Sequence, residues 1–262
     1  MPHRLLVLER LDDDSFLAQT QWRGYDRLYG GQVAAQSLRA ACTTVGPDRL
    51  PHSLHSYFIL AGRAGEPVQL DVQRTRDGRS FSTRHVTASQ GGKAIFELVC
   101  SFHVEEEGDE WQLPPPDDLT LPDPPGDGSM PRWDGVGGLF EIRPVRPLPE
   151  YDPFALHPVW LRTAERLDDD PVTHLCLLTF LSDLGVLGST RAPGSRTAYR
   201  SAASLDHSVW FHRPVRVDEW LRFSSAPVTN HGARGMARAE LHTQAGVHVA
   251  SVAQESLLRP QR

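Results

Sequence analysis

The chain has 262 residues and a formal charge of −6, with 39% hydrophobic and 23% charged residues. This composition is typical of a soluble globular protein with a sizeable core, in one large domain or two ordinary ones. The acidic balance and the lack of a Lys/Arg cluster argue against a nucleic-acid-binding protein. The sequence contains no run of about eighteen apolar residues, so it predicts no membrane span. The first residues lack the pattern of a secretion signal.

Three cysteines, Cys42, Cys100 and Cys176, are widely spaced and stand in apolar surroundings. Their spacing does not match that of a metal-ligand set. We therefore expect reduced, buried thiols in a cytoplasmic protein, with no metal and no other cofactor.

The first part of the chain predicts a close-packed helix. Residues 5–21 are typical of a short strand or helix, an acidic turn and a strand. Gly30 and Gly31 then precede apolar residues at helical spacing up to Cys42, and many of these residues are alanines. The glycines leave backbone N–H groups open to an anion or a carbonyl oxygen. A tight entry turn is the simpler interpretation of the pair, and we favour it.

Residues 52–104 predict an antiparallel sheet of four strands. The four apolar-rich runs are HSLHSYFIL, PVQLDVQRTRDG, FSTRHVTASQGG and KAIFELVCSFHVE. Asp77-Gly78 and Gly91-Gly92 stand between runs, where such dipeptides favour hairpin turns. The first half thus reads as one helix followed by a long sheet.

Residues 106–158 predict a linker on the surface, because the segment is acidic and rich in proline and cannot pair in a sheet interior. We expect Trp111, Trp133 and Phe140 to anchor parts of it. Residues 144–167 are expected to contain one strand that completes a sheet.

The second half begins with a helix over residues 171–188, which is apolar nearly all round and should be buried. Asp170 or Thr173 is expected to cap it. Asp183 lies inside the apolar run and needs hydrogen-bond partners there. It either caps a turn near the helix end or has a functional role, and we favour the functional role.

Three strands follow residue 214, and their sequence repeats that of the first half at an offset of 152 to 154 residues. His55 corresponds to His207 in this alignment. Two copies of helix and sheet indicate an internal duplication. We predict an N-terminal domain over residues 1–105, the linker over 106–158 and a C-terminal domain over 159–262.

Residues 201–214, SAASLDHSVWFHRP, predict a strand that is polar at one end and apolar at the other. The two-residue period of a strand places Ser204 and Asp206 on one face and His207 on the other. A polar site beside the large side chains of Trp210 and Phe211 suits a ligand that is apolar at one end.

Five motifs resemble those of the acyl-CoA thioesterase II, or TesB-like, family: GGQ at 30–32, HSYF at 55–58, RDG-x-SF at 76–81, DHS-x-W-F-H-R-P at 206–214 and VAQE at 252–255. The resemblance implies an α+β double hotdog fold, in which each of two tandem domains wraps an antiparallel sheet round a long helix. It implies hydrolysis of fatty acyl-CoA to free fatty acid and CoA. Acyl-CoA is then the expected ligand, with no nucleic acid or membrane partner.

The same resemblance implies a catalytic set of Asp183, Ser204 and Gln254. A carboxylate can take a proton from water, and partial desolvation makes Asp183 a stronger base. The hydroxyl of Ser204 and the amide of Gln254 can hold that water. Backbone N–H groups at Gly30 and Gly31 are candidates for binding the substrate carbonyl oxygen. The chain departs from the family pattern at Ser256, where a glycine is expected.

Other assignments remain open. Asp206 is the main rival base. A Ser204 nucleophile with His207 or His212 as base is disfavoured, because the strand period separates Ser204 from His207 and no G-x-S-x-G turn is present. Arg213 either approaches a CoA phosphate or pairs with Asp218 or Glu219.

Two further functions stay in view: a non-catalytic acyl-CoA-binding protein, and a hydratase or dehydratase that would need an Asp–His pair such as Asp206 and His207. Exposed sheet edges and faces predict a homo-oligomer, either a dimer or a tetramer.

Overall fold

The computed structural model describes residues 2–20, 26–123, 138–145, 156–195 and 197–261. Trp133, which we expected to anchor the linker, lies outside them. The described chain contains a 3-10 helix η1 (Pro2–Leu6), two helices of three turns or more, α1 (Gly30–Cys42) and α2 (Pro171–Ser182), and the short α3 (Val186–Ser189). No helix in this part of the chain is long and apolar enough to cross a membrane.

Thirteen strands form one sheet in which every pairing is antiparallel. The strands follow the order β1-β2-β4-β5-β6-β3-β10-β13-β12-β11-β8-β7, and β9 also pairs with β13. Their bounds are β1 (Leu8–Arg10), β2 (Ser15–Ala18), β3 (Arg49–Phe58), β4 (Val68–Asp77), β5 (Phe81–Gln90), β6 (Lys93–Val104), β7 (Phe140–Pro144), β8 (Val159–Thr163), β9 (Tyr199–Ser204), β10 (Asp206–Phe211), β11 (Leu221–His231), β12 (Arg234–Thr243) and β13 (His248–Pro260).

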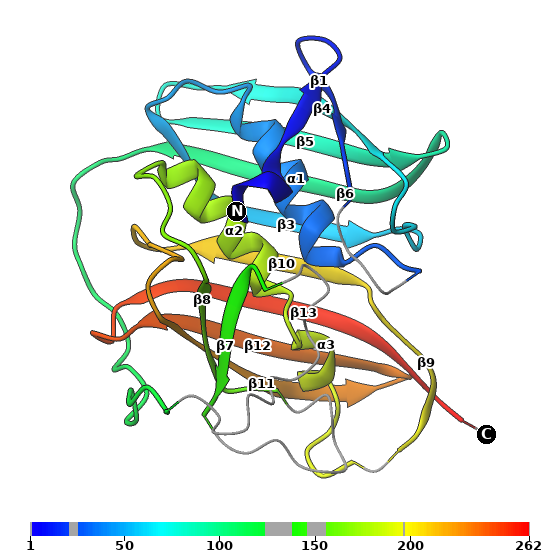
Figure 1. Cartoon of the computed structure of the whole chain (residues 1–262), viewed down its shortest axis with the longest axis vertical. Coiled ribbons are helices and arrows are strands. Elements are labelled where there is room, and N and C mark those ends of the chain that lie inside the picture. Colours follow the sequence, from blue (N-terminus) through cyan, green and yellow to red (C-terminus); the bar gives the residue numbers. More distant parts are fainter. Residues whose placement is uncertain (1, 21–25, 124–137, 146–155, 196, 262) are drawn as a thin grey trace.

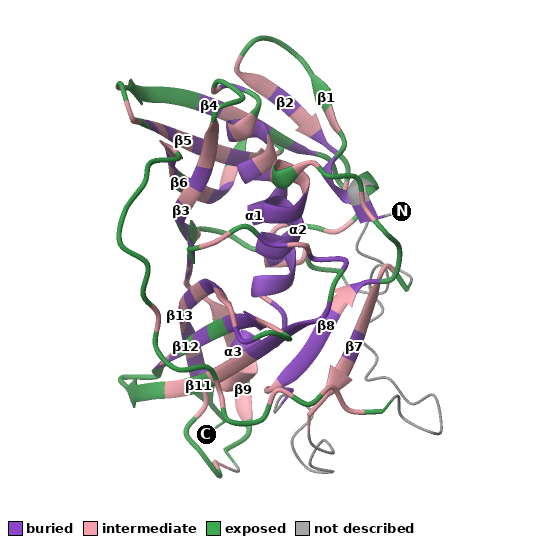
Figure 2. Cartoon of the chain, turned by 90° about the vertical axis from the view of Figure 1, so that its left-hand side faces the viewer, coloured by how far each residue is buried: buried purple, intermediate pink, exposed green. Residues whose placement is uncertain are grey.

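The sheet curls round α1 and α2, which lie side by side on its inner face (Figures 1 and 2). The helix α1 packs against strands of the first half, whereas α2 contacts η1 and β3 of the first half as well as β10 of the second. The halves join where β3 pairs with β10. Two helices wrapped by one continuous antiparallel sheet confirm the expected α+β double hotdog architecture. The boundaries of the three predicted regions stay a prediction.

The local sequence explains both helices. Small residues let α1 pack closely, and Ala34, Ala35, Ala40 and Ala41 are all buried. Asp170 caps α2, because its carboxylate accepts hydrogen bonds from the N–H groups of Val172 and Thr173, as predicted. The helix is buried from His174 to Ser182, which agrees with its apolar sequence. It ends earlier than expected, because Gly185 adopts a left-handed conformation with φ 72°.

The predicted linker contributes more to the sheet than we expected. Its strand β7 pairs with β8, which in turn pairs with β11. Phe140 anchors this region, because its ring stacks on Phe180 at 5.1 Å between centroids. Trp111 does not serve as an anchor, since its side chain is 78% exposed; the neighbouring Gln112 makes the contact instead, through its amide and the carbonyl of Gly246.

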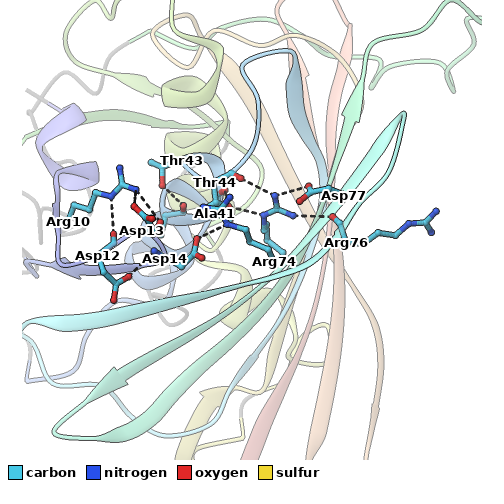
Figure 3. A network of polar contacts seen from close by, with 12 residues as sticks. Arg10, Asp12, Asp13, Asp14, Ala41, Thr43, Thr44, Arg74, Arg76 and Asp77 are labelled. Atoms are coloured by element: carbon cyan, nitrogen blue, oxygen red, sulfur yellow. Dashed lines mark hydrogen bonds and ion pairs between the residues drawn. The ribbon is translucent and has the colours of Figure 1, made fainter.

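A buried arginine holds the far end of α1 in the first half. Arg84 donates to the hydroxyl and the carbonyl of Thr44, just after α1, and to the carboxylate of Asp77 at the end of β4. Figure 3 shows Thr44 and Asp77 on the two sides of this contact, with a second group of exposed charges around Arg10. The helix is therefore fixed to the sheet at the end opposite its glycine pair.

Candidate functional site

The end of α2 meets the start of α1 in the middle of the molecule. Asp183 is the C-terminal capping residue of α2, and its Oδ2 accepts a hydrogen bond of 2.9 Å from the Gly31 N–H. An N–H at a helix start carries partial positive charge, so it stabilises the carboxylate. Asp183 is thus both a helix cap and the acceptor of a bond from the other half.

Burial raises the pKa of Asp183 to about 7, although hydrogen bonds from the Gly31 N–H and the Gln254 side chain act in the opposite direction. Desolvation disfavours the charged form of a carboxyl group, and two donors compensate only part of that cost. A carboxylate with a pKa near 7 can both take and return a proton at neutral pH.

The two glycines allow this close contact. A Cβ on Gly31 would lie 2.3 Å from the Phe180 carbonyl oxygen, and one on Gly30 would lie 2.7 Å from the Phe58 ring and 2.8 Å from Asp183 Oδ2. Neither glycine has a positive φ. The tight entry turn that we favoured therefore does not explain why glycines stand at both positions. They are needed because α2 and β3 pack directly against the backbone at the start of α1.

A β-bulge brings Ser204 and His207 to the same side of the sheet. Ser204 pairs with Ser256 and Ser208 with Ala253, so four steps along β9–β10 match three steps along β13. The extra residue reverses the alternation of side chains, as bulges do. Our prediction that Ser204 and His207 face opposite sides of one continuous strand was therefore wrong.

Gln254 joins these residues in a chain of hydrogen bonds. Its Nε2 donates to Ser204 Oγ at 2.8 Å, and its Oε1 lies 2.7 Å from His207 Nδ1. On the other side of the imidazole, His207 Nε2 lies 2.8 Å from Ser182 Oγ, next to Asp183 in the sequence. Gln254, His207 and Ser182 are buried, with exposed fractions of zero.

The protons in this chain have one consistent order. Burial lowers the pKa of His207 to about 4, so the ring is neutral at pH 7 and has one donor and one acceptor. The Gln254 oxygen requires a donor, which is His207 Nδ1–H, and His207 Nε2 must then accept from the Ser182 hydroxyl, whose single proton is then not donated to the Thr179 carbonyl oxygen. Ser204 in turn accepts from Gln254 and keeps its own proton available for donation.

The rival residues have other partners. Asp206 Oδ1 accepts a bond of 2.6 Å from the Glu255 N–H and so holds the bulge together. Because His207 contacts Gln254 and Ser182, the described contacts contain no Asp206–His207 pair of the kind a hydratase would need. A His207 base with a pKa of about 4 is also poorly suited to activating Ser204 as a nucleophile.

The remaining polar residues of residues 201–214 have structural contacts. His212 bonds Ser251 on the neighbouring strand. Arg213 donates to the carbonyls of His248 and Trp111, and Asp218 pairs with Arg216 instead. His55 bonds Ser208 and faces outward, whereas His207 is buried, so the predicted correspondence between the two histidines was wrong.

Reasoning from sequence missed Ser182 and the role of His207 as its partner. Both positions look ordinary in the sequence, because a serine inside an apolar helix commonly bonds a carbonyl of the preceding turn, and Ser182 Oγ does lie 2.9 Å from the Thr179 carbonyl oxygen. Only the bulge and the helix end together bring them to Gln254.

Comparison with known proteins identifies the family of the chain. The model of the acyl-CoA thioesterase N-terminal domain matches residues 18–103, and the acyl-CoA thioesterase model matches residues 152–257. Acyl-coenzyme A thioesterase 8 from Homo sapiens is 34% identical and covers 97% of this chain and 88% of its own. Acyl-CoA thioesterase II TesB2 from Mycobacterium marinum is 36% identical, with a TM-score of 0.82 over 99% of this chain and 97% of its own.

A conserved protein with a hot dog fold from Alicyclobacillus acidocaldarius has a TM-score of 0.73 at 18% identity, over 100% of this chain and 98% of its own, and supports the fold alone. The two family models together span both halves of the duplication, and the named relatives match nearly the whole chain. The chain therefore belongs to the acyl-CoA thioesterase family.

Proposed function

We propose that this chain hydrolyses fatty acyl-CoA with a water molecule that Asp183, Ser204 and Gln254 activate. The proposal rests on two series of hydrogen-bonded residues, here called arms, that meet at Asp183 and Gln254. One arm joins the start of α1 to Asp183, and the other joins Ser182, His207, Gln254 and Ser204. Gln254 also bonds Asp183 and so connects the two arms.

The chemistry follows from this arrangement. Ser204 and Gln254 orient the water, and Asp183 takes one of its protons as the oxygen attacks the thioester carbonyl carbon. The C–O bond forms, the C–S bond then breaks, and the sulfur of CoA leaves with the proton that Asp183 returns. No covalent enzyme intermediate is needed, and the products are a free acid and CoA.

The start of α1 is our candidate for stabilising the oxyanion. The N–H groups at a helix start carry partial positive charge, which stabilises the negative oxygen that forms as water attacks the carbonyl carbon. The Gly31 N–H bonds Asp183 in this structure. In the proposed reaction it shifts toward the carbonyl oxygen when Asp183 becomes protonated, because a neutral carboxyl is the weaker acceptor.

The test is release of CoA from acyl-CoAs of increasing chain length. We expect hydrolysis by the wild type and a loss of about 100-fold or more in kcat for Asp183→Asn and Ser204→Ala, with binding retained. Asp206→Asn is the matched control and should keep most activity. Tight binding without release by the wild type would favour the non-catalytic binding protein, and loss of activity in Asp206→Asn alone would make Asp206 the base.

We also infer a cytoplasmic homo-oligomer, formed through the outer face of the sheet where the two halves join. Tyr57 on β3 and Val99 on β6 are 62% and 44% exposed, and Trp210 on β10 is 37% exposed. Exposed apolar groups on adjacent strands favour association. Light scattering should give a dimer or tetramer, and Trp210→Glu should shift it toward the monomer.

A further inference from the structure

A cluster of histidines lies on the outer face of the second half, at the start of β13 and six residues before Gln254. Glu240 and His242 stand two residues apart on β12, and His248 on β13 pairs directly with His242. The ligand atoms of these three side chains all lie within 4.8 Å of one another. His212 follows β10, and its ring centroid lies 4.7 Å from that of His248.

One polar atom of this cluster, His242 Nδ1, has no hydrogen-bond partner among the described residues. His242 is only 2% exposed, and its Nδ1 is buried without a hydrogen bond. Leaving a buried polar atom unpaired costs free energy, so such an atom in a cluster of metal-ligating side chains calls for a further ligand. The proposed function makes no use of any of these residues.

We propose that Glu240, His242 and His248 form a binding site for a divalent transition-metal ion, with zinc as the best match. Two imidazoles and one carboxylate are a common ligand set for zinc, with a fourth position left for water or another side chain. The imidazole of His212 is near enough to occupy that fourth position after a rotation of its side chain.

Binding requires movements of the exposed side chains. Bonds of about 2.1 Å in a tetrahedral site place ligand atoms about 3.4 Å apart, so the present atoms must close by up to about 1.4 Å. Glu240 is exposed and His248 is partly exposed, so rotations of these two side chains can supply the change. The rings of His242 and His248 are stacked at 4.7 Å with 18° between their planes, and a metal must lie in the plane of each imidazole that binds it. The partly exposed His248 must therefore turn out of this stack, away from the Ala250 carbonyl and Ser251 Oγ, before both rings can bind one ion.

Two charges nearby act against a cation. Arg222 on β11 stands opposite His242 in the pairing of β11 with β12. Arg213 is the next residue after His212. The carboxylate of Glu240 offsets one positive charge. We therefore expect binding weaker than in a closed structural zinc site of four protein ligands, and strong dependence on Glu240.

The site would join β12, β13 and the end of β10, which already lie close together beside the predicted linker. Gln112 of the predicted linker accepts a bond from the His248 N–H and donates to the Gly246 carbonyl, so the linker lies beside the cluster. A metal held by β12 and β13 would fix this hairpin, and His212 would add the end of β10. Its role is therefore structural, since the ligands do not contact Asp183, Ser204 or Gln254.

The test is titration of the chelator-treated full chain with zinc in a calorimeter. We expect one equivalent to bind, with affinity at least tenfold weaker in Glu240→Gln and at least tenfold weaker in His248→Ala. Both positions tolerate change because their side chains reach solvent, whereas a variant of buried His242 risks misfolding. Cobalt should give the visible absorption bands of a tetrahedral site in the wild type only.

The matched control is His103→Ala. His103 also lies on the outer face, 3.8 Å from the carboxylate of Glu106, with a second imidazole, His52, at 6.2 Å between ring centroids. This variant should bind zinc as the wild type does. No binding to the wild type, or binding that survives both Glu240→Gln and His248→Ala, would overturn the proposal.

Discussion

Asp183→Asn should make stability less dependent on pH while it removes activity. Burial raises the pKa of Asp183 from 3.8 to about 7, so the folded state holds this proton more tightly than the unfolded state does. The stabilisation is complete below the unfolded pKa and is lost as the pH rises toward the folded one. For these two values the loss between pH 5 and pH 8 is about 2.5 kcal/mol. Asparagine has the same shape and does not titrate, so the variant should lack this loss.

The assay is urea unfolding at pH 5, 6, 7 and 8, followed by tryptophan fluorescence. The difference in unfolding free energy between Asp183→Asn and the wild type should change by about 2.5 kcal/mol in favour of the variant as the pH rises. Groups common to both proteins cancel in this difference. Ser204→Ala is the control, because it changes the same site without a titrating group and should follow the wild type. Parallel curves for Asp183→Asn and the wild type would refute the reasoning.

Three further predictions concern the same site. The kcat/KM of the wild type should rise about tenfold per pH unit below pH 7 and level off above it, because Asp183 must be ionised to act as base; a flat profile from pH 5 to 8 would exclude this role. His207→Asn keeps an N–H near the position of Nδ1, so it should retain more kcat than His207→Leu, which should lose at least about tenfold at similar KM; equal losses would mean that His207 only fills space. Gly31→Ala places a methyl group 2.3 Å from a backbone oxygen and should cost about 1–3 kcal/mol in urea unfolding, whereas Gly108→Ala, with no atom within 4 Å, should cost almost nothing.

Local patterns in the sequence were sufficient for most of the fold. Alternation and hairpin dipeptides located β4, β5 and β6, and the apolar run of α2 predicted its burial. Such patterns report local periodicity and burial, which these elements obey. The strand β7 was missed because it is short and lies among prolines, and its pairing depends on β8.

The candidate site depended on information that local patterns lack. The motifs pointed to Asp183, Ser204 and Gln254, and the structure brings Gln254 into contact with both of the others. The period of a regular strand gave the wrong side for His207, because a bulge is a change of register between two strands and has no signal in one strand alone. The contact of Gly31 with Asp183 spans 152 residues and depends on how the two helices pack.

The bulge has a counterpart in the first half, and this bears on how the duplicated halves diverged. On β3, Pro51 pairs with Phe102 and Ser53 with Ser101, so one extra residue stands there as it does beside Ser204 and Ser256. Two residues before Phe102 the first half has the buried Cys100, where the second half has Gln254 two residues before Ser256. The kink is thus common to both copies, while Gln254 of the candidate site belongs to the second copy alone. A symmetric scaffold supplies the same backbone geometry twice, and the first copy places a buried thiol, bonded to the Arg84 carbonyl, where the second has a carboxamide.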